Sequence, residues 1–253
     1  MMQIKLYIRL IMKGAKLMHK KLTAIILLTS LLLTGCGSSA KDDTSMPQNK
    51  TETEMTTDYV TEDVVITDYD DALARLKDGN SRFLNDKSEL INVTSERRNQ
   101  LLDGQKPYAV IVSCSDSRIT PTTIFDAGLG EIFDIRIAGN VVDSDALGSI
   151  EYGVEHLNSP LLVVMGHEKC GAVTAAYEKV KNGTSIEGNL KSIVDKIEPN
   201  IKDADSLDEA IHENTEAVQE QIEEDEIVKR LIDEGKLKVV KAHYSLDGKV
   251  TFD

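Results

Sequence analysis

Two uninterrupted apolar segments of strand length constrain the fold of this chain most: YAVIVSC at residues 108–114 and LLVVMGH at residues 161–167. A strand with one wet face alternates apolar and polar residues, whereas a strand buried on both faces reads as a continuous apolar run. Segments with helical spacing lie between and after these runs. Strands that alternate with helices predict a parallel sheet covered by helices on both faces.

The other segments complete this plan. We predict an α/β fold with a mostly parallel central sheet flanked by helices, an N-terminal helical arm and a C-terminal edge hairpin that turns at Asp247 and Gly248. The third strand is expected at 131–139 and the hairpin at 236–253. Helices are expected at 67–86, 95–102, 120–128, 144–157, 170–183, 189–201 and 207–234.

The N-terminal segment reads as a processing signal rather than as part of the fold. A basic flank precedes an apolar stretch from Leu22 to Leu33, which is shorter than the ~20 residues of a comfortable bilayer span. The following Thr-Gly-Cys resembles the lipobox of bacterial lipoproteins, in which the chain is cut before a cysteine that is then lipidated. We therefore predict a signal peptide at 1–35, starting at Met1 or Met18, and lipidation of Cys36. The alternative is an uncleaved membrane anchor.

This reading divides the chain into three parts and predicts its location. Residues 36–67 are rich in Thr, Ser, Asp, Glu and Lys and read as a lipidated N-terminus followed by a flexible tether. Residues 68–253 form the folded domain. The protein is accordingly expected outside the cytoplasm, held to a bacterial membrane through lipid at Cys36.

The charge balance excludes one class of partner. The chain carries 43 Asp and Glu against 29 Lys and Arg, for a formal net charge of −14. Such a surface repels nucleic acid and anionic lipid, and it favours solubility. We expect no nucleic-acid partner.

Chemically versatile side chains follow both buried runs. Cys114, Asp116 and Arg118 come at the end of the first run, and His167 and Cys170 come at the end of the second. Sites in parallel sheets form at the carboxyl ends of strands. Two cysteines and one histidine are a zinc ligand set that leaves a fourth position available, so we predict one zinc ion per chain.

Two other readings of these residues remain open. An exported protein with two cysteines left after lipidation can hold them as a disulfide, although that bridge gives no role to His167, Asp116 or Arg118. A closed structural zinc site, with Asp116 as its fourth ligand, is the stronger rival. Three other histidines are expected to have no ligand partner nearby and to be ordinary surface or packed residues: His156, His212 and His243.

The motifs CSDSR and GHEKCGA, in this order, resemble those of the β-class carbonic anhydrases. RIAGN, GSIEYGVEHL and the closing YSLDGKVTF support the resemblance, which covers roughly residues 69–253. The family commonly has Asn where this chain has Ile137. The chain has no Trp, so it lacks the residue associated with a regulatory bicarbonate site in some members.

The resemblance implies reversible hydration of carbon dioxide to bicarbonate and a proton by a zinc-bound hydroxide. It assigns Cys114, His167 and Cys170 to the zinc, and Asp116 with Arg118 to a catalytic dyad that orients the bound water or hydroxide. Apart from the resemblance, Gly139 and Asn140 stand at the end of a predicted strand and can present backbone N–H groups near the substrate. The resemblance also implies a homodimer or a higher even oligomer, with the N-terminal helix crossing to the partner. Hydrolysis of a related molecule such as carbon disulfide, and a non-catalytic zinc-stabilised lipoprotein, are the alternatives.

Overall fold

The structure is a computed structural model that describes residues 65–88 and 92–253. The predicted signal peptide, Cys36 and nearly all of the predicted tether lie outside the described residues. The last residues of that tether segment are described, and Ile66 packs against the apolar core. Apolar packing of the folded domain therefore begins slightly before residue 68.

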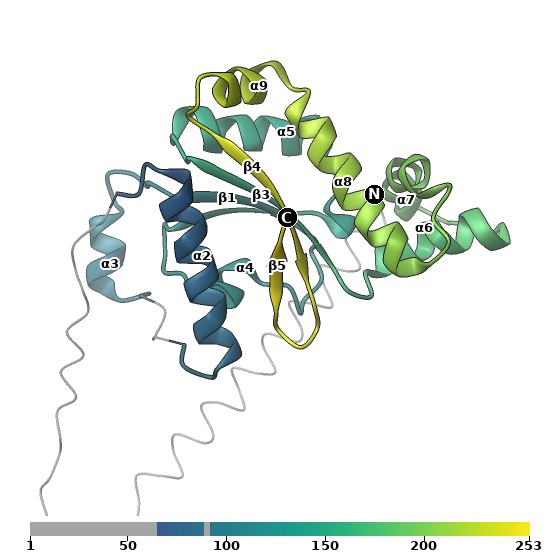
Figure 1. Cartoon of the computed structure of the whole chain (residues 1–253), viewed down its shortest axis with the longest axis horizontal. Helices are drawn as coiled ribbons and strands as arrows, with labels where there is room; N and C mark the ends of the chain where they lie inside the picture. Colours follow the sequence, from purple (N-terminus) through teal and green to yellow (C-terminus); the bar gives the residue numbers. More distant parts are fainter. Residues whose placement is uncertain (1–64, 89–91) are drawn as a thin grey trace, which may run out of the picture. The chain divides into compact units, whose positions relative to one another are not determined.

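A five-stranded sheet in the order β2-β1-β3-β4-β5 forms the centre of the described part (Figure 1). Its first four strands pair in parallel, and the last pairs antiparallel as a hairpin. The parallel strands run in register, with Ser113 opposite Arg136 and His167 opposite Tyr244. The strands are β1 (Ala109–Ser113), β2 (Ile132–Arg136), β3 (Leu161–His167), β4 (Lys238–Tyr244) and β5 (Val250–Phe252).

Helices connect the strands and cover both faces. The α-helices are α2 (Tyr69–Leu84), α3 (Ser95–Gln100), α4 (Pro121–Ile124), α5 (Ser144–Glu151), α6 (Gly171–Asn182), α7 (Leu190–Ile197), α8 (Leu207–Glu223) and α9 (Glu226–Asp233). Shorter turns are the 3₁₀ segments η1 (Ala138–Asn140) and η3 (Glu198–Ile201) and the π-helical segment η2 (Tyr152–His156). In the part of the chain that the structure describes, no helix is long and apolar enough to cross a membrane.

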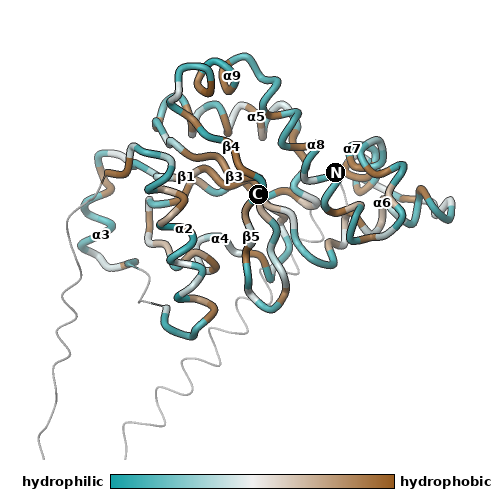
Figure 2. The backbone as a smooth tube through the Cα atoms, in the orientation of Figure 1, coloured by the Kyte–Doolittle hydropathy of each residue, from teal (hydrophilic) through white to brown (hydrophobic). Residues whose placement is uncertain are grey.

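The buried strands supply both halves of the core. Every residue of β1 and β3 is buried, and alternate side chains of each strand point to opposite faces. Ile111 and Val163 pack with α2 and α4 on one face, and Val112 and Val164 pack with α5, α8 and α9 on the other. Figure 2 shows the strands as mostly hydrophobic between helices of mixed polarity. The parallel sheet predicted from the apolar runs is thus confirmed.

Three predicted helices differ from the structure. The segment 207–234 is two helices, because the Asp225 side chain accepts hydrogen bonds from the backbone N–H groups of Ile227 and Val228 and so begins α9. The helix expected at 120–128 covers only Pro121–Ile124. The helix expected at 144–157 ends its α-helical part at Glu151 and continues as the π-helical segment.

Candidate metal centre

Two thiols and one imidazole meet at the carboxyl ends of β1 and β3. Cys114 directly follows β1, His167 is the last residue of β3, and Cys170 precedes the first residue of α6. Their ligand atoms all lie within 4.8 Å of one another, and the two Sγ atoms are 3.9 Å apart in free thiols. All three residues are at least 96% buried. The parallel pairing of β1 with β3 therefore brings together residues that lie 53 positions or more apart.

The His167 ring is oriented as a metal ligand. Its Nδ1 lies 3.0 Å from the backbone oxygen of Glu168, which can only accept, so Nδ1 carries the proton. Nε2 is then the lone-pair nitrogen. It is buried, and no group among the described residues hydrogen-bonds to it. An orphaned imidazole nitrogen beside two thiols fits a zinc ion, because metal-bound histidines commonly donate their other N–H to a carbonyl.

The turn between His167 and Cys170 is tightly held. Lys169 has a positive φ of 55°, a left-handed conformation that a residue with a side chain rarely adopts outside a constrained turn. The backbone N–H of Glu168 donates to the oxygen of Tyr244, and the Glu168 carboxylate accepts from the N–H of Leu246. The end of β3 is thereby fastened to β4 and to the hairpin turn, and Cys170 is turned back toward His167.

The environment of Cys114 stabilises a thiolate. The hydrogen bond that Cys170 donates, together with those from the backbone N–H groups of Gly139 and Asp116, lowers the pKa of the Cys114 thiol to about 4. The two amide nitrogens lie 3.3 and 3.4 Å from the sulfur. The hydrogen bond that Cys170 donates to Cys114, followed by burial and the neighbouring negative charge, raises the pKa of Cys170, so in the absence of metal this pair shares one proton. A bound metal cation would balance the charge of the second thiolate, so the two cysteines are suited to hold a metal ion together.

Asp116 and Arg118 form a two-pronged ion pair beside the thiols. Arg118 Nε lies 2.9 Å from Asp116 Oδ1, and its Nη2 lies 2.7 Å from Oδ2. The backbone N–H of Arg118 also donates to Oδ1. These bonds hold the pKa of Asp116 below its usual range. Both carboxylate oxygens accept hydrogen bonds from Arg118, and Asp116 is not part of the convergent group of ligand atoms.

Two further residues hold the backbone around Cys114 and Gly139, and the sequence analysis did not identify them. Arg136, the last residue of β2, donates to the backbone oxygens of Cys114 at 3.3 Å and Asp116 at 2.7 Å. The sequence feature that could have identified Arg136 is its place in RIAGN, at the end of a predicted strand. Asn214 of α8 is fully buried and donates to the oxygen of Gly139 at 3.0 Å.

The backbone at Gly139 serves the sulfur, which differs from the role expected for it. Its φ is 69°, and a Cβ there would lie 2.7 Å from Ile197 Cδ1 and 3.1 Å from the Cβ of Ala172. Only glycine fits this close approach, which directs the N–H at Cys114. The amide therefore stabilises a ligand atom, where the sequence analysis expected it near a substrate.

A second group of possible metal ligands corrects the reading of two histidines. Asp208, His212 and His243 place their ligand atoms within 4.8 Å of one another. His212 and His243 were expected to lack partners, but their rings stack with centroids 4.4 Å apart. His156 instead packs against Tyr152 with the two rings tilted by 36°, at 5.5 Å between centroids.

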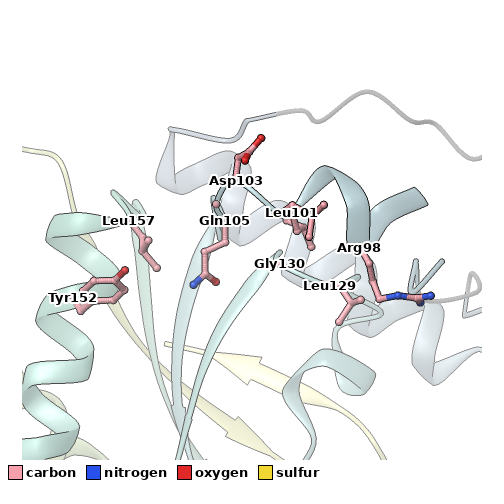
Figure 3. Close-up of a pocket in the computed structure, with 10 residues that line it drawn as sticks. Arg98, Leu101, Asp103, Gln105, Leu129, Gly130, Tyr152 and Leu157 are labelled. Carbon is pink, nitrogen blue, oxygen red and sulfur yellow. The ribbon is translucent and has the colours of Figure 1, made fainter. Parts of the chain in front are cut away.

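An open surface pocket of about 620 Å³ lies away from these groups (Figure 3). Leu157 and Tyr152 line one side, and Arg98, Leu101 and Leu129 line the other. None of the predicted metal or dyad residues contributes to its lining. It is therefore separate from the candidate metal centre.

The fold and the convergent thiols and imidazole define an α/β protein with a ligand set suited to a transition metal at the carboxyl ends of parallel strands. The family model described as carbonic anhydrase matches residues 109–250, which include all three ligand positions and both dyad positions. The chain belongs to the carbonic anhydrase family.

Individual relatives agree with this assignment. The chain is 46% identical over 126 residues to "Carbonic anhydrase 2" of Mycobacterium tuberculosis, a match that covers 50% of this chain and 61% of the relative. The match thus spans less than two thirds of that relative. A crystal structure of a β-carbonic anhydrase of Aspergillus fumigatus is 26% identical, with a TM-score of 0.55, and the match covers 73% of this chain and 89% of the other.

A structure described as a tetrameric β-carbonic anhydrase of Sordaria macrospora shows the same fold. It is 23% identical, with a TM-score of 0.57, and the match covers 72% of this chain and 96% of that chain. The predicted fold and its similarity to the β class are confirmed.

Proposed function

We propose that this protein catalyses the reversible hydration of carbon dioxide to bicarbonate and a proton, with one zinc ion per chain. One observation carries the proposal: the unpartnered Nε2 of His167 and two thiols converge beside the Asp116–Arg118 pair. A closed structural zinc site would take Asp116 as its fourth ligand, whereas here Arg118 binds both carboxylate oxygens. Membership of the carbonic anhydrase family supports the same activity.

Cys114, His167 and Cys170 would hold the zinc. Bound there, zinc supplies a Lewis acid that lowers the pKa of water and so makes a nucleophile available near neutral pH. The residues around the three ligands fix their protonation states. The Glu168 oxygen keeps the His167 proton on Nδ1, and the amides of Gly139 and Asp116 stabilise the Cys114 thiolate.

Asp116 orients the reacting water. Its Oδ1 accepts two hydrogen bonds from Arg118, but its Oδ2 accepts only one from among the described residues. Oδ2 therefore keeps an acceptor position for the proton of a water or hydroxide. Accepting this hydrogen bond would turn a lone pair of the water or hydroxide oxygen toward carbon dioxide. Arg118 keeps Asp116 ionised, and through its bidentate grip it keeps the carboxylate off the metal position.

The activity is tested by a stopped-flow carbon dioxide hydration assay on the purified full chain. We expect activity to disappear when a chelator removes zinc and to return when zinc is added back. Magnesium is the matched control, because thiolate ligands do not select it. A zinc-loaded chain that hydrates carbon dioxide no faster than buffer at any pH contradicts the proposal and favours a closed structural site with Asp116 on the zinc.

We also propose that the protein is a lipoprotein anchored outside the cytoplasm through Cys36. The proposal is supported by the basic flank, the short apolar stretch and the Thr-Gly-Cys sequence at its end. Two lipid chains or more give stable membrane anchoring, whereas one chain does not. Cys36→Ser is expected to leave the precursor uncleaved and without lipid label. Normal processing of this variant would refute the assignment.

We further propose that the protein assembles as a homodimer or a higher even oligomer. Apolar side chains are exposed around the pocket of Figure 3: Leu102 is 78% exposed, Tyr152 48% and Leu129 39%. Ala72 and Leu76 of α2, in contrast, are fully buried against the sheet of their own chain. Light scattering is expected to give an even multiple of the chain mass. An active monomer would contradict the proposal.

A further inference from the structure

Three metal-ligand side chains meet on the face of the sheet that α8 covers. Asp208 and His212 lie four residues apart on α8 and therefore on one side of the helix, and His243 lies on β4. Their ligand atoms are within 4.8 Å of one another. We propose that these residues form a second metal site, for a divalent transition-metal ion, distinct from the Cys114 centre.

The donor set fits this class of ion. Two imidazoles and one carboxylate suit zinc, cobalt, nickel and copper, whereas calcium and magnesium prefer sites made of oxygen alone. Two donors on one ion, at bonds of about 2.1 Å, are at most about 4.2 Å apart. The observed spacing therefore requires a small closure of the ligand atoms, and one ring must turn out of the stack so that both nitrogen lone pairs point at the ion. Asp208 is exposed and the histidines are half-buried, so these side chains have room to adjust.

The stacking of the two rings favours neutral imidazoles over two protonated ones, because two positive charges this close repel each other. The His212 and His243 rings are tilted by only 20° at a centroid distance of 4.4 Å. Burial and the neighbouring His212 lower the pKa of His243, while Asp208 opposes that change. His167 and Glu168 also act on His243, in opposite directions. Neutral imidazole is the form that binds metal.

The surroundings of the site attract cations. Asp208 and Glu209 both lie in the first turn of α8. Burial and the charges of nearby acidic residues (Glu209, Asp203 and Asp205) raise the pKa of the next-door Glu213, and Lys181 opposes that change. The second site needs no carbonic anhydrase activity, so this proposal stands apart from the proposed function. Its ligands would tie α8 to β4.

Cobalt added to the zinc-loaded full chain tests the proposal. We expect about one Co²⁺ to bind per chain, with visible d–d bands and without the thiolate-to-cobalt charge-transfer bands that occupation of the Cys114 centre would produce. His212→Gln, His243→Asn and Asp208→Asn each remove one ligand and should weaken cobalt binding by at least about tenfold. His156→Gln is the matched control, because its ring contacts Tyr152 and not the site. It should bind cobalt like the parent.

Three results would overturn the proposal. They are no cobalt uptake by the zinc-loaded parent, charge-transfer bands that show uptake only at the thiolates, and equal weakening in His156→Gln. Circular dichroism establishes that each variant is folded. Because three separate ligands are removed one at a time, a single misfolded variant leaves the other two to decide. The zinc content of each protein shows that the first centre remains loaded.

Discussion

The buried Asn214 offers a sharp test of how the fold supports the metal centre. Its side-chain nitrogen donates to the oxygen of Gly139 at 3.0 Å, and its side-chain oxygen accepts from Asn200 at 3.1 Å. The N–H of the same Gly139 donates to Cys114. A chain of hydrogen bonds thus runs from α8 to the metal-binding sulfur. We expect Asn214→Leu, which nearly keeps the volume, to destabilise both the fold and the metal site.

The magnitude follows from the groups that lose their partners. Asn214 is fully buried and Gly139 is buried, so the carbonyl of Gly139 loses its side-chain donor without gaining a water. An orphaned buried polar group costs about 1–3 kcal/mol, and the half-buried Asn200 adds a smaller cost, for a total of about 2–4 kcal/mol. Loss of a group that bonds directly to a metal ligand weakens metal affinity by about 10–100-fold, and Asn214 acts one step further out, so we expect a loss near the lower end, about tenfold.

Two measurements check these values. Denaturant unfolding of the metal-free chain gives the loss of stability, and competition with a zinc chelator gives the loss of affinity. Thr215→Val is the matched control, because Thr215 is the next residue of α8, is also buried, and hydrogen-bonds only within its own helix. It should cost less than about 1.5 kcal/mol and leave zinc affinity unchanged. Parent-like zinc affinity in Asn214→Leu would refute the reasoning.

Three more predictions follow from the packing, the charges and the thiols. A Cβ at Gly166 would lie 2.2 Å from Thr215 Oγ1, so Gly166→Ala should cost about 1–3 kcal/mol of stability by overpacking, whereas Gly148→Ala, with open space, should gain a few tenths or more in the same unfolding assay. The pairing with Arg118 depresses the pKa of Asp116 in the folded protein. The ionised carboxylate should therefore stabilise the fold above about pH 4, the usual pKa of an aspartate, and this contribution should be lost as the pH falls through the lower pKa of the folded state. The difference in stability between the parent and Asp116→Asn should accordingly shrink in acid. Mass spectrometry under denaturing conditions should find both thiols of the metal centre reduced, and a bridge between them in active, metal-free protein would contradict the site.

The parallel sheet and the position of the first metal site were readable from the sequence for a physical reason. Strands buried on both faces leave continuous apolar runs, and residues directly after such strands gather at one edge of the sheet. Cys114 and His167 each stand at the end of such a run. Their meeting therefore depended only on strand pairing.

The contributions of α8 were not readable from the sequence, because tertiary packing creates them. Asn214 lies 75 positions from Gly139, and His212 meets His243 only where α8 crosses β4. No local spacing encodes either contact. The break at Asp225 was missed for a different reason: an aspartate in a run of helix-forming residues looks like part of a solvated helix face until its capping bonds are seen.

The central claim is that Asp116 and Arg118 make an enzyme of a zinc site, and one comparison tests it most directly. Zinc content and carbon dioxide hydration rate are measured across pH for the parent and for Arg118→Ala, which leaves all three zinc ligands intact. We predict one zinc per chain in both proteins and a hydration rate about 10–100-fold lower in the variant. If the fully zinc-loaded parent is inactive, or if Arg118→Ala is as fast as the parent, the dyad does not drive the chemistry.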